Sequence, residues 1–168
     1  MIPTLVFLFA FVPMLVEARV STMHELALRR EGAYEPPDDV YPVMHVAYPA
    51  LFLIMIGEGL VRGVVFDAFV ACGAVVFVAA KALKYWAIST LGVRWTFRVL
   101  VPPGSVRVAD GPYRWMRHPN YLAVAGELAG TALTMHAWIT GGPALVCFVA
   151  LMWRRIAVEE RALAAAEE

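Results

Sequence analysis

Residues 111–130 read GPYRWMRHPNYLAVAGELAG, and this stretch organises the interpretation of the whole chain. It places a Gly-Pro turn, two arginines and a His-Pro-Asn-Tyr step directly before an apolar run that contains one carboxylate, Glu127. Ionisable side chains inside an apolar helix are costly and are usually retained for function. We therefore expect a polar site at the mouth of an apolar helix.

The composition indicates an integral membrane protein. Of the 168 residues, 61% are hydrophobic and 17% are charged, whereas soluble domains are about half apolar. The formal net charge is zero, so overall charge gives no argument for a nucleic-acid partner. Cys72 and Cys147 lie in separate apolar segments without metal-ligand spacing, which predicts two inert buried thiols and no metal site.

Five apolar segments predict an all-α membrane fold with about five transmembrane helices. The segments cover residues 2–16, 43–65, 69–91 and 121–138, and a fifth begins at 143–153. No Lys or Arg precedes the first segment, so we interpret it as a helix and not as a signal peptide. We expect one membrane domain over residues 1–168, with three N-terminal spans in 1–91 and a cofactor-binding loop and helical hairpin in 92–168.

The connections between these segments predict the topology. Residues 21–39 are polar and are expected to form a solvated connection. Arginines gather in 19–30, 94–117 and 154–161, and the positive-inside rule places all three groups in the cytoplasm, with the N-terminus outside. The 92–117 loop is too polar to cross lipid. Its strand-like part, 94–101, must lie in water or against protein.

Two pairs of charges inside the spans have a structural interpretation. Glu58 and Arg62 lie one helical turn apart, which favours an ion pair near the interface. Lys81 and Lys84 share a helix face, and we expect them to extend their amines to the lipid headgroups.

A simple count relates the last two spans. If they fold back on each other at Gly141, Tyr121 lies 20 residues before the turn and Glu160 lies 19 after it. Glu127 and Arg155 each lie 14 residues from the turn. We therefore expect the His118–Tyr121 step to face the Glu159–Glu160 pair.

The same count predicts a partner for Glu127. An isolated carboxylate at membrane depth is expensive, so Glu127 should point inward and pair with Arg155 or Arg154. The resulting pocket would suit a polar, partly cationic ligand that meets an apolar substrate from the bilayer.

Each part of this hairpin also has a purely structural interpretation. Gly126 and Gly130 form a small-xxx-small pattern that is typical of close helix packing. Pro119 is a common helix start, with His118 or Asn120 as the cap. The two glutamates are compatible with a solvated helix face. The combination at matched depths favours a site.

The motif resembles a known family. GPYRWMRHPNYLAVAGE, followed later by RRIAVEERAL, is similar to the isoprenylcysteine carboxyl methyltransferases, integral membrane enzymes that use S-adenosylmethionine. The resemblance covers residues 84–163. The upstream LGVRWTFRVLVPPG is similar to the bacterial branch, some members of which O-methylate alkylpyrones or related polyketides.

The resemblance implies a set of residues around S-adenosylmethionine. Carried over by motif position, and extended to their neighbours in the hairpin, the cofactor-binding residues are Tyr113, Arg117, His118, Pro119, Asn120, Tyr121, Glu127, Arg155, Glu159 and Glu160. The chain lacks an Asn and a His that the eukaryotic branch has in the loop at 94–98, and it lacks a Tyr-rich C-terminal extension. Both departures argue against a prenylated protein substrate.

The chemistry of methyl transfer agrees with these residue types. In-line displacement at a sulfonium requires alignment and an electron-rich acceptor, and no metal. Carboxylates can hydrogen-bond the ribose or amine of the cofactor. We predict that Arg94 and Arg98 are catalytic residues that hold an anionic acceptor oxygen.

The predicted function is therefore a membrane S-adenosylmethionine-dependent methyltransferase that acts on an oxygen (carboxylate, enol or phenol) of a small lipophilic acceptor. We place it in the bacterial inner membrane, among membrane lipids, with its site facing the cytoplasm. Alternatives are a phospholipid or amine N-methyltransferase, an NADPH-dependent sterol-type reductase and a nonenzymatic assembly subunit. No basic cluster is clearly dedicated to the 2′-phosphate of NADPH.

Overall fold

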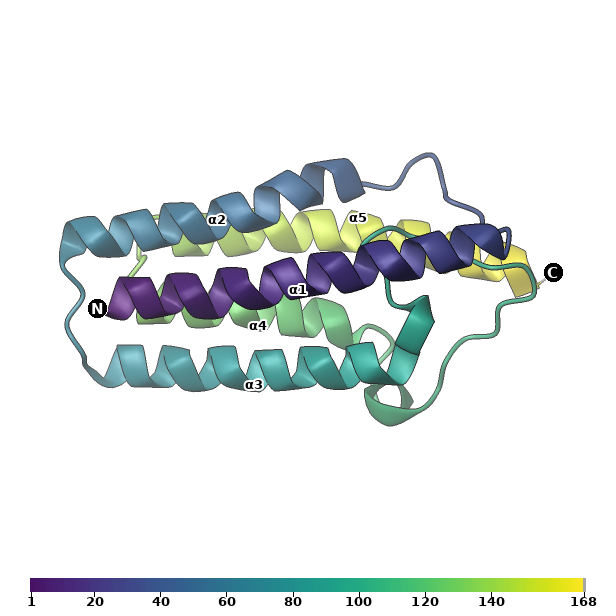
Figure 1. Cartoon of the computed structure of the whole chain (residues 1–168). Helices are drawn as coiled ribbons and strands as arrows, with labels where there is room; N and C mark the ends of the chain where they lie inside the picture. The colour runs from purple at the N-terminus through teal and green to yellow at the C-terminus, as the bar shows by residue number, and fades with distance from the viewer. Residues whose placement is uncertain (168) are drawn as a thin grey trace.

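Five α-helices run along one axis in a computed structural model that describes residues 1–167 (Figure 1). They are α1 (Ile2–Arg30), α2 (Tyr41–Arg62), α3 (Ala68–Leu91), α4 (Pro119–Thr134) and α5 (Gly141–Glu167). Two short 3₁₀ helices, η1 (Gly92–Arg94) and η2 (Gly111–Arg114), flank the long loop between α3 and α4. Across residues 1–167 the one β pairing is an isolated antiparallel bridge between Tyr34 and Val101.

The prediction of an all-helical membrane protein is confirmed. Four helices, α1, α2, α3 and α5, are long and apolar enough to cross a membrane. The fifth, α4, has 16 residues, which corresponds to about 24 Å of helix and is shorter than a typical span. Met135 to Thr140 then form the turn into α5.

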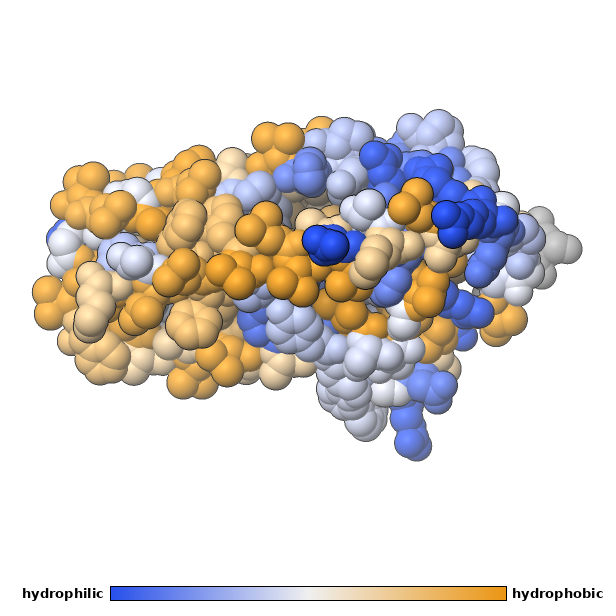
Figure 2. All heavy atoms as spheres, in the orientation of Figure 1, coloured by the Kyte–Doolittle hydropathy of each residue, from blue (hydrophilic) through white to orange (hydrophobic). Residues whose placement is uncertain are grey.

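Polar and apolar surfaces separate along the bundle axis. In Figure 2 the end that carries the N-terminus is mostly hydrophobic, and the end that carries the C-terminus is mostly hydrophilic. We call the latter the polar end. It gathers the C-terminal halves of α1 and α5, the connection 31–40 and the loop 92–118 (Figure 1).

The first helix is longer than expected. The prediction that residues 21–39 form a solvated connection is wrong for its first half, because α1 continues to Arg30. Ser21 and Leu28 are buried two turns apart on one face of this extension. Its outer face is polar, so hydropathy alone ended the helix too early, whereas the buried face packs at the polar end of the bundle.

Glycines bring α3 and α4 into close contact. A Cβ atom on Gly130 would lie 2.7 Å from the backbone nitrogen of Phe77 and 2.8 Å from the Gly73 carbonyl oxygen. A Cβ atom on Gly126 would lie 2.9 Å from the Ala80 Cβ. The prediction of close packing through the small-xxx-small pattern is confirmed, and α4 makes its most extensive contact with α3.

This packing predicts a large effect from one added methyl group. Gly130→Ala should lower the unfolding free energy by about 1–3 kcal/mol, because backbone atoms block the new Cβ. Gly57→Ala is the matched control, since a Cβ there meets nothing within 4 Å. Thermal unfolding in detergent should separate the two variants. Equal melting temperatures would contradict the close packing of α3 on α4.

Glu58 fixes the turn between α4 and α5. Its carboxylate accepts hydrogen bonds from the backbone nitrogens of Ile139 (3.1 Å) and Thr140 (2.9 Å), and it pairs with Arg62 at 2.7 Å as predicted. Cys72 and Cys147, by contrast, are exposed. The prediction that they are buried is wrong, because both side chains lie on the outward faces of their helices, and apolar residues on such faces meet lipid.

Candidate active site

A cavity of about 460 Å³ opens inside the polar half of the bundle. All five helices and the loop 91–108 contribute to its wall. Its volume lies within the range of small-molecule sites, about 300–1,000 Å³. The lining combines polar groups from the predicted site with apolar side chains from α1, α2 and α5, including Phe11, Met14, Met44 and Phe148.

The His-Pro-Asn-Tyr step faces the glutamate pair, as the hairpin count predicted. Tyr121 donates a 2.8 Å hydrogen bond to Oε2 of Glu159. His118 Nε2 lies 2.9 Å from Oε1 of Glu160. His118 occupies the N-cap position of α4 but makes no side-chain capping hydrogen bond. Its ring is turned toward the carboxylate of α5.

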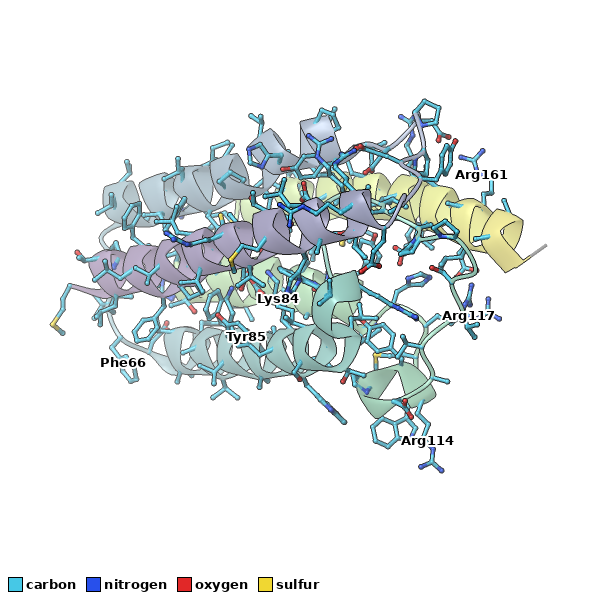
Figure 3. The ribbon with its side chains drawn as sticks, turned by 45° about the vertical axis from the view of Figure 1, so that its right-hand side comes forward. Phe66, Lys84, Tyr85, Arg114, Arg117 and Arg161 are labelled. Atoms are coloured by element: carbon cyan, nitrogen blue, oxygen red, sulfur yellow. The ribbon has the colours of Figure 1, made fainter. Side chains whose placement is uncertain are left out.

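Glu160 is held by two arginines from the loop before α4. Arg107 Nη2 lies 2.9 Å and Arg117 Nη1 lies 3.5 Å from Oε2 of Glu160. Arg107 was not among the predicted site residues. Figure 3 shows Arg117 and Arg161 extending from the polar end. Glu160 therefore has partners outside its own helix and is not simply part of a solvated helix face.

Arg155 joins three segments at the base of this group. It is 7% exposed, and its Nε donates a 2.9 Å hydrogen bond to the Tyr121 hydroxyl. Its guanidinium also donates to the Phe97 carbonyl oxygen and lies 3.4 Å from Oδ1 of Asp39. Asp39 in turn accepts from the Val99 backbone nitrogen at 3.0 Å. Arg155 thus ties α5 to α4, to the 95–101 segment and to the connection before α2.

The predicted pairing of Glu127 with Arg155 or Arg154 is wrong. Glu127 points inward as expected, with 1% of its surface exposed, but its partners are Lys81 at 3.0 Å and Lys84 at 3.3 Å. Counting from the turn gives the depth of a residue and not its direction around the helix. Glu127 lies on the face of α4 that packs against α3, and Arg154 is exposed.

The same contacts overturn the prediction for the two lysines. Lys81 and Lys84 do not extend to the headgroups, because both also pair with Glu17 of α1, at 3.0 Å and 2.7 Å. The four charged side chains are almost completely buried. Tyr48 of α2 donates a hydrogen bond to Glu127. We call Glu17, Lys81, Lys84 and Glu127 the buried charge cluster; Figure 3 shows Lys84 between the ribbons of α1 and α3.

Arg94 and Arg98 both line the cavity, but their side chains have protein partners. Arg94 is exposed and donates a 2.8 Å hydrogen bond to the Val106 carbonyl oxygen. Arg98 pairs with Glu35 at 2.6 Å and with Glu25 at 3.5 Å. The hydrogen bond that Arg98 donates to Glu35 is the main reason that the pKa of Arg98 is raised. Burial alone would raise the pKa of Glu35, but the hydrogen bonds from arginines outweigh it and lower that pKa.

The remaining predicted residues lie in the same cavity wall, with one exception. Tyr113 from η2 and Asn120 from α4 line the cavity, whereas Pro119 is buried at the first turn of α4. Burial, and then the nearby Glu159 carboxylate, raise the pKa of Tyr113. Within residues 1–167, Asn120 Oδ1 and Trp95 Nε1 are buried without a hydrogen-bond partner. Such orphaned polar atoms beside a cavity are candidates for ligand contacts.

Sequence reasoning missed the contributions of Asp39, Phe97 and Trp95. No spacing rule connects these residues with α5, so only the folded chain brings them to Arg155 and the cavity. The charges at 17, 81 and 84 were visible as ionisable groups in apolar helices, which is a signal of function in itself. The prediction for Lys81 and Lys84 placed their amines at the headgroups, because both lysines lie near the end of their apolar segment.

The protein is thus an all-helical membrane bundle. In it, the Arg-His-Pro-Asn-Tyr sequence at the start of α4 faces the Glu-Glu pair of α5. Residues 71–165 match the isoprenylcysteine carboxyl methyltransferase (ICMT) family. The chain belongs to this family and is an integral membrane protein of the methyltransferase class.

Two bacterial relatives match most of the chain. An uncharacterised protein of Bacillus subtilis (strain 168), YpbQ, is 31% identical over 147 residues, which is 88% of this chain and 88% of the relative. An uncharacterised protein of Haemophilus influenzae is 26% identical over 145 residues, or 86% and 84% of the two chains. No solved structure gives a significant match.

Proposed function

We propose that the protein transfers a methyl group from S-adenosylmethionine to an oxygen of a small lipophilic acceptor. One observation carries the proposal. The cavity joins a polar wall, which includes His118, Tyr121 and Glu159, to an apolar wall that reaches into the membrane-spanning part of the bundle. A polar cofactor and a lipid-soluble acceptor can meet in such a cavity.

The residues present fit the cofactor. Glu159 lines the cavity with its side chain 33% exposed, so its carboxylate is accessible to ribose hydroxyls or to an ammonium group. Asn120 has a buried amide oxygen without a partner in the described chain, which is suited to accept a hydrogen bond from the same ligand. Trp95 and Phe97 add aromatic rings that attract cations. When bound there, S-adenosylmethionine supplies the electrophilic methyl group.

The protein's own contribution is positioning. Arg155 holds the Tyr121 hydroxyl and the Phe97 carbonyl together, which fixes the cofactor motif relative to the 95–101 segment. That segment forms part of the cavity wall. Arg94 and Arg98 remain our candidates for holding the acceptor oxygen, and the ion pairs of Arg98 fix its guanidinium at the cavity wall. Alignment of this kind can lower the activation barrier of a two-substrate reaction by a large amount.

We place the site on the cytoplasmic side of a bacterial inner membrane. The three arginine-rich segments, 19–30, 94–117 and 154–161, all lie at the polar end, and positively charged ends of membrane proteins face the cytoplasm. This orientation gives the cavity access to a cytoplasmic cofactor and to acceptors dissolved in the bilayer.

Cofactor binding tests the proposal most directly. Detergent-purified protein should bind S-adenosylhomocysteine in isothermal titration calorimetry, and Glu159→Gln should weaken binding about tenfold or more, as expected for losing a charge-assisted hydrogen bond. Glu31→Gln, at an exposed position outside the cavity, is the matched control and should bind as the wild type does. Binding of NADPH in place of S-adenosylhomocysteine would identify a reductase and overturn the proposal.

The acceptor atom needs a second experiment. Membranes incubated with methyl-labelled S-adenosylmethionine should yield a labelled, chloroform-soluble product, and mass spectrometry should place the label on oxygen. Label on nitrogen would instead identify an amine or phospholipid N-methyltransferase.

A further inference from the structure

The buried charge cluster forms part of the cavity wall. Glu17 and Lys84 line the cavity, as does Tyr48, which contacts the cluster through Glu127. Lys81 and Glu127 do not line it, and they form ion pairs with the other two from behind the cavity wall. The cavity therefore has a second polar region besides the one around His118 and Glu159.

This second region lies deeper in the bundle than the predicted cofactor motif. Glu127 follows Tyr121 in α4 by six positions, which corresponds to about 9 Å along the helix axis. The surrounding lining is apolar and includes Phe11, Met14 and Phe148. A ligand that fills the cavity thus meets an isolated polar patch inside an otherwise apolar compartment.

The charges of the cluster balance. Two lysines and two glutamates, each within 3.3 Å of both opposite partners, give a net charge of zero. Removing four ions from water costs several kcal/mol for each ion. Hydrophobic side chains of similar volume often stabilise a protein as well as a buried ion pair does, or better. Charges at membrane depth are therefore expected to have a function beyond stability.

We propose that the Glu17–Lys84 edge of the cluster, with Tyr48, is the recognition site for a neutral hydrogen-bonding group, such as a hydroxyl or carbonyl oxygen, on the acceptor. The substrate class is then an amphiphile with a neutral oxygen group at this patch, apart from the acceptor oxygen that we assign to Arg94 and Arg98. A carboxylate, phosphate or ammonium group on this patch would leave one uncompensated charge in the bilayer interior. This inference rests on the proposed function, since it describes the acceptor of the same cavity.

Three probes with the same alkyl chain and ring test the inference: 4-dodecylphenol, 4-dodecylbenzoate and dodecylbenzene. Their binding is measured by equilibrium dialysis against protein in lipid nanodiscs, with empty nanodiscs subtracted. The wild type should bind the phenol about tenfold more tightly than dodecylbenzene, which is the effect of one additional hydrogen bond. It should also bind the phenol more tightly than the benzoate.

Two charge-balanced double variants separate recognition from folding. Glu17→Gln/Lys84→Met removes the cavity-lining pair and leaves the Lys81–Glu127 pair at 3.0 Å. Lys81→Met/Glu127→Gln removes the supporting pair and leaves the Lys84–Glu17 pair at 2.7 Å. The first variant should lose the preference for the phenol over dodecylbenzene. The second should keep it.

The remaining outcomes overturn the inference. A preference that survives in the first variant, that disappears equally in both variants, or that is absent from the wild type would show that the cluster does not recognise the probe. Tighter binding of the benzoate than of the phenol would exclude a neutral group. Titration of the same samples with S-adenosylhomocysteine tests the cofactor separately, so a failure of the proposed function is distinguishable from a failure of this inference.

Discussion

Arg155→Met is expected to lower methyl transfer at least a hundredfold, the loss that misplacement by about 1 Å can cause in an aligned reaction. The arginine contacts Tyr121, Phe97 and Asp39 at once. A methionine replaces the aliphatic stem of the arginine but makes none of these hydrogen bonds. Transfer of labelled methyl groups into a lipid extract measures the loss.

Two matched variants sharpen this experiment. Arg155→Lys should remain strongly impaired, because a single ammonium group does not reproduce the planar fork that reaches three partners. Arg154→Met changes the adjacent, exposed arginine and should retain most of the activity. If Arg155→Met keeps more than about a tenth of the wild-type rate, the positioning role is refuted.

Glu127→Ala is expected to lower the unfolding free energy by about 3–5 kcal/mol, because it breaks a buried ionic network and leaves an uncompensated positive charge. Lys81 and Lys84 would then share Glu17 alone. Unfolding in mixed micelles with increasing sodium dodecyl sulfate measures the change.

Removal of one lysine should reverse much of this damage. In Lys81→Met/Glu127→Ala the remaining Lys84–Glu17 pair is again neutral, so the double variant should be more stable than Glu127→Ala alone. The coupling between the two substitutions should reach about 1–3 kcal/mol, as found for residues of one ion-pair network. Purely additive effects would mean that the charges act independently.

Counting residues from the turn between α4 and α5 predicted part of the site correctly. The His118–Tyr121 step meets the Glu159–Glu160 pair because both spans are regular helices on either side of one turn, and helical rise is constant. The count placed His118 and Tyr121 opposite the glutamates correctly. It placed Glu127 at the level of Arg155 but gave no information on direction, and Glu127 faces α3.

The sequence by itself determined the membrane class, the helical architecture, the arginine-rich end and the two halves of the site. These follow from hydropathy, charge distribution and regular helical rise, which are local properties. Only the tertiary structure decided which side chains Glu127 and Arg155 pair with. Gly73 and Gly130 let α4 approach α3, and this brings Glu127 to Lys81 and Lys84. Arg155 is thereby left to bind Tyr121, Phe97 and Asp39, because the rotation of a helix depends on all the surfaces that pack against it.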